Sequence, residues 1–227
     1  MMISNPFKTA FGVFEGIDYS GKSEQFERTK TFLTAYHERL PVTYAKEPDR
    51  TRPTGATIYE ILEGKHQEYR LENLSPSHFQ TFYIEDRMLN YRSNILPALF
   101  RGRHVIQDRG AASSFAYGAD SPKDFFDFMG MHERIFSAAE MPFIWPDFIL
   151  IFDVPVDVAL ARASQASRAK DKFEVGEKLE RARANYLAFA QHYPNCHIID
   201  GDRKPEDIFV EVKGYVYQAL GLNREAQ

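Results

Sequence analysis

An apolar strand, a glycine-containing turn and the start of a helix follow one another in Phe11-Gly12-Val13-Phe14-Glu15-Gly16-Ile17-Asp18-Tyr19-Ser20-Gly21-Lys22-Ser23. Four of these residues, Gly16, Gly21, Lys22 and Ser23, have the spacing G-x-x-x-x-G-K-[ST] of the Walker A phosphate loop. Glycines let the backbone turn so that successive N–H groups point at phosphate oxygens, and the N-terminus of the next helix adds its dipole. The pattern predicts that Lys22 reaches the β- and γ-phosphates and that the Ser23 hydroxyl binds Mg²⁺.

The composition is typical of a globular protein with a full apolar core. The chain has 227 residues, of which 44% are hydrophobic and 26% charged, and its formal net charge is −4. This charge does not favour binding to nucleic acid or to an anionic membrane surface. The single cysteine, Cys196, excludes an intramolecular disulfide and a cysteine-based metal cluster. No apolar signal segment or membrane-length run is present, so we expect one cytoplasmic domain, residues 1–227.

Apolar strand patterns alternate with helical periodicity along the chain. Beyond the first strand, the predicted strands are 42–46, 104–109, 147–154 and 196–200. The predicted helices after the first are 54–64, 75–99, 110–117, 124–139, 155–161, 177–192 and 206–220. This alternation predicts an α/β protein with the P-loop NTPase fold, a doubly wound five-stranded parallel sheet flanked by helices. Its ligands are expected outside the carboxyl ends of the strands.

Charged residues follow two of the predicted strands at the edge where ligands are expected. Arg50 and Arg52 are candidates for bidentate phosphate binding, although arginines in a solvated loop would have the same pattern. Asp108 is a candidate for orienting a Mg²⁺-bound water, and Arg109 for binding phosphate. A structural salt bridge between Asp108 and Arg109 is the alternative. Both interpretations remain open on the sequence alone.

Two further segments have more than one interpretation. Helix 75–99 carries phenylalanines and tyrosines at helical spacing, which is typical of core, but one ring stacking on a base beside a hydrogen-bonding Arg87 would have the same pattern. The segment 162–177 is too polar for core and contains the cations Arg162, Arg168, Lys170 and Lys172. We expect it to be a mobile lid that brings positive charge over the transferred phosphoryl group, with a solvated linker as the alternative.

Over nearly its whole length the chain resembles the thymidylate kinase family of P-loop nucleoside monophosphate kinases. The order and spacing of the resembling segments are together specific. These segments are 14–23 with Gln25, Glu47-Pro48, Asp86-Arg87, 95–99 with Gly102, 105–109 with Ser113-Ser114 and Ala116-Tyr117, Asp153-Val154-Pro155 with Leu160 and Arg162, and 171–174.

The resemblance implies transfer of the γ-phosphoryl group of ATP·Mg²⁺ to dTMP, giving dTDP and ADP, by a cytoplasmic homodimer. Mg²⁺ would be held by Ser23 and Asp108. The implied ATP-binding residues are Gly16, Ile17, Asp18, Tyr19, Ser20, Gly21, Lys22, Ser23 and Glu24, with Arg162 against the adenine. The implied dTMP-binding residues are Asp18 at the 3′-hydroxyl, Arg50 and Arg109 at the phosphate, Tyr83, Arg87 and Ser114 at the base, and Tyr117 under the sugar.

The resemblance also implies which residues are catalytic. Family members that lack an arginine in the phosphate loop supply lid arginines instead. Because Tyr19 occupies that loop position here, Arg168 is the predicted catalytic lid cation, with Lys172 second. Lys22 and Asp108 complete the expected catalytic set.

Several positions depart from the family pattern. Glu24 replaces a threonine, Asp49-Arg50 replaces a glycine pair, Gly110 replaces an aromatic residue or histidine, and Gly118 replaces a glutamine. The last two lie beside the acceptor and leave strict thymine specificity open. A related kinase for another deoxynucleoside monophosphate, or for a deoxynucleoside with Glu15 as the base, is one alternative. A nucleotide-binding regulatory module without turnover is another.

Overall fold

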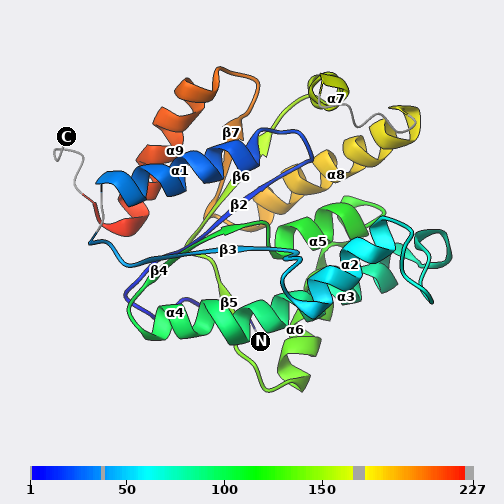
Figure 1. Cartoon of the computed structure of the whole chain (residues 1–227), viewed down its shortest axis with the longest axis horizontal. Helices are drawn as coiled ribbons and strands as arrows, with labels where there is room; N and C mark the ends of the chain where they lie inside the picture. Colours follow the sequence, from blue (N-terminus) through cyan, green and yellow to red (C-terminus); the bar gives the residue numbers. More distant parts are fainter. Residues whose placement is uncertain (1, 37–38, 166–171, 223–227) are drawn as a thin grey trace.

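The computed structural model describes residues 2–36, 39–165 and 172–222, and they form helices around a parallel sheet (Figure 1). The sheet has five parallel strands in the order β3-β4-β2-β6-β7. These strands are β2 (Phe11–Gly16), β3 (Val42–Lys46), β4 (His104–Asp108), β6 (Phe148–Asp153) and β7 (Cys196–Asp200). All five were predicted from the sequence. The earliest strand, β2, lies at the centre, where the chain switches sides, so the phosphate loop opens at the crevice that such sheets use for ligands.

Helices cover both faces of this sheet (Figure 1). One face packs against α1 (Lys22–Tyr36) and α9 (Pro205–Leu220). The other packs against α3 (Pro76–Asn90), α5 (Ala111–Gly118), α6 (Phe125–Ala138) and α8 (Lys172–His192). The remaining helical segments are α2 (Pro53–Leu62), η1 (Leu71–Asn73), η2 (Tyr91–Ile95), α4 (Leu96–Phe100), η3 (Pro122–Asp124) and α7 (Val156–Gln165).

The strand residues of β2 show how the two core layers arise. Phe11 and Val13 point into the core with α3, α5 and α8, whereas Phe14 points into the core with α1 and α9. Side chains alternate across a strand, so a strand covered on both faces needs apolar residues at successive positions. The apolar residues at successive positions of β2 are therefore the direct consequence of burial on both sides.

A second sheet was not predicted. It pairs β1 (Met2–Ser4) in parallel with β5 (Phe143–Trp145), and each strand has only three residues. The three residues of β5 are buried, and those of β1 are largely exposed. A three-residue strand gives too little alternation to distinguish it from a loop by periodicity.

The predicted helix over 75–99 begins as expected but is interrupted. Ser75 accepts a hydrogen bond from the His78 N–H at 3.2 Å, and Pro76 occupies the first helical turn. After α3 the chain forms the π-helical turn η2 and then α4. Pro97 has no N–H to donate within a helix, which accounts for the irregular turn before it.

The predicted lid segment, 162–177, is helical at both ends. Its first residues complete α7, and α8 begins at Lys172, before the predicted start at Glu177. The expectation of a connection over all of 162–177 was therefore wrong at its ends. Lys, Glu and Leu near the start of α8 are good helix formers, and a polar composition does not by itself exclude a helix. Within the described ranges, no helix combines the length and the apolar character needed to cross a membrane.

Candidate active site

The phosphate loop leaves β2 and enters α1 through a tightly turned backbone. Gly16, Tyr19 and Gly21 have positive φ angles of 148°, 65° and 89°. A Cβ atom on Gly16 would lie 2.6 Å from the Phe152 carbonyl oxygen of β6, so only glycine fits there. Residues 17–24 and Arg109 line a cleft of about 250 Å³. The structure thus brings Arg109, which was predicted from a separate segment, to the predicted phosphate site.

Lys22 and Ser23 both contact Asp108 across the edge of the sheet. The Lys22 ammonium forms a buried ion pair with Asp108 Oδ1, and Ser23 Oγ lies 3.3 Å from Asp108 Oδ2. Asp108 ends β4, whose register with β2 places it opposite Phe14 and beside the loop. Burial lowers the pKa of Lys22 to about 8, and the neighbouring Arg109 cation acts in the same direction, against the attraction of Asp108.

The same pair of oxygens suits a magnesium ion. A hydroxyl and a carboxylate from Ser23 and Asp108 are hard oxygen ligands, and Mg²⁺ commonly completes its coordination with water and substrate phosphates. Among the described residues, no group of three His, Cys, Asp or Glu side chains is arranged to hold a metal. A Mg²⁺ ion here would therefore depend on oxygen atoms of the bound nucleotide.

Arg109 is held in place by contacts with four residues. Its Nη1 donates to the Gly16 carbonyl at 3.1 Å, to Ser113 Oγ at 3.1 Å and to Tyr186 Oη at 3.2 Å, and its Nη2 pairs with Asp18. The salt bridge considered between Asp108 and Arg109 is replaced by two others, one to Lys22 and one to Asp18. Arg109 is thus oriented as a cation at the mouth of the phosphate loop.

Glu15 shares with Arg109 two hydrogen-bonding partners, Ser113 and Tyr186. The carboxylate is fully buried and accepts from the Gly110 N–H at 2.7 Å, from Ser113 Oγ at 2.6 Å and from Tyr186 Oη at 3.0 Å. These donors occupy both carboxylate oxygens. The arrangement fits a structural support and does not favour the role of a base for a deoxynucleoside acceptor.

Tyr117 joins the sugar-contact candidates to the same loop. Its hydroxyl accepts a hydrogen bond from the Asp18 N–H at 2.9 Å, and the Arg109 guanidinium carbon lies 5.4 Å from its ring centroid. Burial raises the pKa of Tyr117 and also that of Tyr83, which lies one helical turn before Arg87. Asp18, Arg109 and Tyr117, all predicted acceptor residues, therefore cluster in the structure.

Arg87 forms the centre of a second, buried cluster. It is 2% exposed, and its Nε donates to Glu47 Oε2 at 2.8 Å. Its Nη1 contacts Ser114 Oγ at 3.1 Å and His132 Nε2 at 2.6 Å, and its Nη2 donates to the Gly110 carbonyl at 2.8 Å. The contact between Arg87 and Ser114 joins two residues that were predicted to meet the base.

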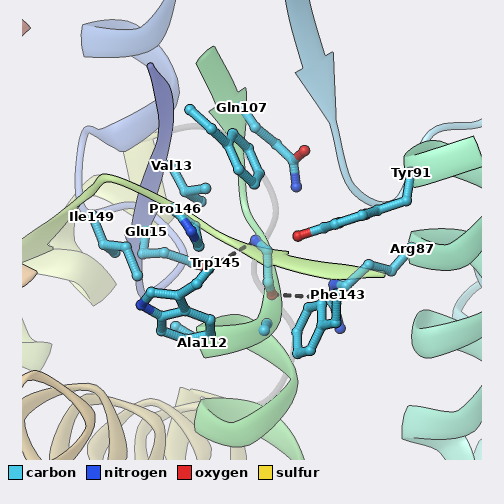
Figure 2. Close-up of a pocket in the computed structure, with 13 residues that line it drawn as sticks. Val13, Glu15, Arg87, Tyr91, Gln107, Ala112, Phe143, Trp145, Pro146 and Ile149 are labelled. Carbon is cyan, nitrogen blue, oxygen red and sulfur yellow. Dashed lines mark hydrogen bonds between the residues drawn. The ribbon is translucent and has the colours of Figure 1, made fainter. Parts of the chain in front are cut away.

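Gly110 links the two clusters through its backbone. Figure 2 shows Glu15 and Arg87 on either side of the short segment to which both are hydrogen-bonded, Glu15 at the Gly110 N–H and Arg87 at the Gly110 carbonyl. A small cavity of about 10 Å³, close to the room needed by one water, lies beside it. A Cβ atom on Gly110 would lie 3.3 Å from Val13 Cγ1. The glycine that departs from the family pattern here therefore lies in a closely packed position.

Gly118 has a similar packing explanation. A Cβ atom there would lie 2.3 Å from Gln80 Cγ of α3 and 2.6 Å from the Phe128 ring of α6. The space that a larger residue would need is filled by these two neighbouring helices. Neither glycine departure therefore requires a change in the groups that would contact the acceptor.

The two arginines after β3 behave differently from the expectation for a shared phosphate clamp. Arg52 is buried and pairs with Asp86 through two bonds of 2.8 and 2.6 Å. Arg50 is 59% exposed, pairs with Glu63 at 2.5 Å and lies 3.6 Å from the Tyr59 ring centroid. These contacts hold Arg50 against α2 and not against the phosphate loop or Arg109.

Of the remaining predicted residues, some lie beside the phosphate loop and others lie outside the described residues. Arg162 of α7 donates to the Tyr19 carbonyl at 3.3 Å and to the Gly201 carbonyl at 2.9 Å, which places it beside the phosphate loop. Glu24 lines the cleft and pairs with Arg28. Arg168 lies outside the described residues, as does the side chain of Lys172.

Several residues that hold the site together were not predicted from the sequence. Tyr186 comes from α8 and His132 from α6, and both lie within helices whose pattern predicts core. Glu47 precedes a cis peptide bond to Pro48 and was noted only as part of a resemblance. Periodicity reports burial but not the partner that a buried polar group will meet, so no signal in the sequence identified these contacts.

Sequence comparison identifies related proteins that cover most of the chain. The family model for thymidylate kinase matches residues 14–212. A thymidylate kinase from Methylobacillus flagellatus is 33% identical over 208 residues, covering 89% of this chain and 94% of the relative. One from a Janthinobacterium species is 34% identical over 213 residues, covering 91% and 95% respectively. One from Fervidobacterium nodosum is 32% identical over 209 residues, covering 89% and 95%.

Proposed function

Because the chain belongs to the thymidylate kinase family, we propose that it transfers the γ-phosphoryl group of ATP to dTMP, giving dTDP and ADP. The observation that carries this proposal is the cleft in which the phosphate loop and Arg109 converge. Phosphoryl transfer between nucleotides needs a loop that binds the phosphates of the donor nucleotide and a separate cation that binds the phosphate of the acceptor. The reaction then depends on in-line positioning and on neutralising charge.

On the donor side, the N–H groups of residues 16–24 would bind the ATP phosphates, and Arg162 would lie against the adenine. Lys22 would leave its ion pair with Asp108 to contact the β- and γ-phosphates. Ser23 and Asp108 would hold Mg²⁺, which when bound neutralises phosphate charge. The proximity of their oxygens supports this assignment.

On the acceptor side, Arg109 would hold the dTMP phosphate and Asp18 the 3′-hydroxyl. Tyr117 would pack under the sugar, where a 2′-hydroxyl is disfavoured. Tyr83 would stack on the base while Arg87 and Ser114 hydrogen-bond to it. Arg50 would join Arg109 at the phosphate only after leaving Glu63, and its exposed position makes that change accessible.

The proposal also covers the lid segment, the oligomeric state and the cellular compartment. Residues 1–227 would act as one kinase domain in which 162–177 closes over the phosphates, with Arg168 as the catalytic cation and Lys172 as the second candidate. The chain would form a homodimer, as the family resemblance implies. It would act in the cytoplasm, and its free thiol at Cys196 suits a reducing compartment.

An ADP-release assay tests the proposal directly. ATP·Mg²⁺ is mixed with dTMP, with other deoxynucleoside monophosphates, with UMP and with thymidine, and ADP production is followed for each acceptor. We expect a clear preference for dTMP and no turnover of thymidine, which lacks the phosphate that Arg109 would hold. Preference for another acceptor would mean that the site binds a base other than thymine. ATP binding without turnover on any acceptor would overturn the proposed reaction.

A further inference from the structure

We infer that His132 is a positioning residue that fixes the Arg87 guanidinium in the orientation in which it meets the acceptor base. The contact between them spans α6 and α3 at 2.6 Å. The inference rests on the proposed function in one respect, since it takes Arg87 to contact a base. It assigns to α6, whose pattern predicted only core, a part in acceptor recognition.

The surroundings of His132 determine which ring nitrogen carries the proton. The residue is fully buried, and its Nδ1 lies 2.9 Å from the Phe128 carbonyl oxygen, an acceptor only. Nδ1 must therefore donate, which leaves Nε2 as the acceptor for the Arg87 Nη1. The imidazole also stacks on Phe143 of β5, with ring centroids 5.9 Å apart and planes 13° from parallel. Both the tautomer and the plane of the ring are fixed.

The charge state of His132 agrees with this role. Burial, and then the adjacent Arg87 cation, lower the pKa of His132 to about 3. The imidazole is therefore neutral at physiological pH. A neutral ring accepts a hydrogen bond from Arg87, whereas an imidazolium could only donate and would repel the guanidinium.

The contacts of Arg87 leave a defined donor for a ligand. A guanidinium has five N–H groups. Glu47 takes the one on Nε, Ser114 and His132 take the two on Nη1, and the Gly110 carbonyl takes one on Nη2. The second Nη2 N–H is the donor that remains after these contacts. It would meet a base edge that presents a hydrogen-bond acceptor, such as the 4-keto oxygen of thymine.

Removing His132 would change the orientation of Arg87 more than its charge. Without the Nε2 acceptor, one Nη1 N–H is left buried and unpaired, which is unfavourable. The guanidinium would then turn to satisfy it at the expense of the Nη2 geometry. The expected consequence is weaker binding of the acceptor nucleotide, with the phosphate site left intact.

Three variants separate positioning from structural support. His132→Phe keeps an aromatic ring against Phe143 but removes the acceptor, whereas His132→Gln restores a side-chain oxygen that accepts from Arg87. Phe136→Leu is the matched control, because Phe136 lies one turn further on α6 and packs on Phe143 and Tyr91. Each variant is assayed for kcat and for the KM of dTMP and of ATP, and its folding is checked by thermal unfolding.

We expect His132→Phe to raise the KM for dTMP about tenfold, as loss of one hydrogen bond to a charged group predicts, with the KM for ATP unchanged. His132→Gln should recover most of this loss, and Phe136→Leu should lower stability without changing the KM for dTMP. The inference is overturned if His132→Phe leaves the KM for dTMP within twofold of wild type. It is also overturned if His132→Gln is no better than His132→Phe.

A measurement on the wild-type protein without nucleotide separates this inference from the proposed function. Nitrogen-15 NMR at pH 7 should show His132 as a neutral imidazole protonated at Nδ1. A ring protonated at Nε2, or at both nitrogens, would overturn the inference whether or not the protein phosphorylates dTMP. Absence of dTMP turnover, with the Nδ1–H tautomer observed, would overturn the proposed function and leave the contact with Arg87 established.

Discussion

At the phosphate end of the site, most ligand groups come from one turn of backbone, whereas at the base end they come from side chains on separate elements. The phosphate loop forms an open cleft from residues 17–24 with Arg109, the residue after β4, added to it. The Arg87 cluster instead joins α3, α5 and α6 with the end of β3 and the turn after β4. Its central side chain is 2% exposed.

The two ends of the site differ in how well they tolerate the loss of a side chain. The loop holds its shape through backbone conformation, so changing the Lys22 side chain removes only its contacts with Asp108 and the neighbouring Ser23. At the base end each polar side chain satisfies another buried one, so a single change leaves partners unpaired. Variants at the phosphate end should therefore reduce rate, and variants at the base end should reduce stability and acceptor affinity.

Substitution of Arg168, the predicted lid cation, which lies outside the described residues, should give the largest effect. We expect Arg168→Ala to lower kcat about 10³–10⁵-fold, the range for loss of an arginine that stabilises transferring phosphoryl charge. The KM for ATP should change far less. Steady-state kinetics beside Lys172→Ala tests the assignment. Turnover comparable with wild type would reject the role of Arg168, and a larger loss in Lys172→Ala would transfer it to that lysine.

Arg87→Met tests the expected cost of disrupting the base end. Burial raises the pKa of Glu47, and Arg87 opposes that shift, so the variant leaves a buried carboxylate without its cation. We expect the free energy of unfolding in urea to fall by about 3–5 kcal/mol. The control is Arg50→Met, whose exposed ion pair with Glu63 should contribute little. Equal losses in the two variants would remove the distinction between the buried and the exposed arginine.

Lys22→Met should reduce the rate of the reaction more than the stability of the fold. We expect kcat to fall about 10²–10³-fold, as for loss of one preorganised charge-stabilising group. The loss of stability should be smaller than in Arg87→Met, because Asp108 keeps its contact with Ser23 and burial already disfavours the Lys22 cation. Lys30→Met, on the exposed side of α1, serves as the control in kinetic and urea-unfolding measurements. An unfolded variant, or one within tenfold of wild-type kcat, would contradict the division between the two ends.

The pH dependence of nucleotide binding should give the smallest effect. Lys22 attracts phosphate only as a cation, and with a pKa of about 8 it is mostly charged at pH 7 and mostly neutral at pH 9. The affinity for ADP should therefore weaken as pH rises, by about tenfold between these values. Isothermal titration calorimetry measures it, and Lys22→Met should lack the change. A constant wild-type affinity would show that Lys22 does not titrate in this range.

The same contrast explains how much was predictable from the sequence. The strands and the phosphate loop are local features of the sequence: apolar runs that alternate with helical periodicity predicted the sheet, and Gly16 to Ser23 predicted the loop. The contacts of Arg87 join residues 40, 45 and 23 positions away in the chain, to Glu47, His132 and Gly110. The contact of Tyr186 with Glu15 spans 171 positions. Such pairings follow from the folded arrangement and leave no local periodic signal.

The two arginines after β3 show the same limit over a shorter distance. Arg50 and Arg52 were both candidates for phosphate binding, with Arg50 favoured, yet Arg52 is paired with Asp86 and Arg50 with Glu63. Only the position of α3 decides which one meets a buried carboxylate. The short strands β1 and β5 were missed for a related reason, since three residues contain too few alternations to predict a strand.

The most direct test compares dUMP and dCMP as acceptors for the wild-type protein, because dUMP presents a keto oxygen at position 4 of the base and an N–H at position 3, whereas dCMP presents an amino group and an unprotonated nitrogen. If Arg87 presents a fixed donor there, kcat/KM should favour dUMP by at least about a hundredfold, with the KM for ATP unchanged. Equal kcat/KM values for dUMP and dCMP would contradict the account, because the buried Arg87 cluster would then take no part in choosing the acceptor.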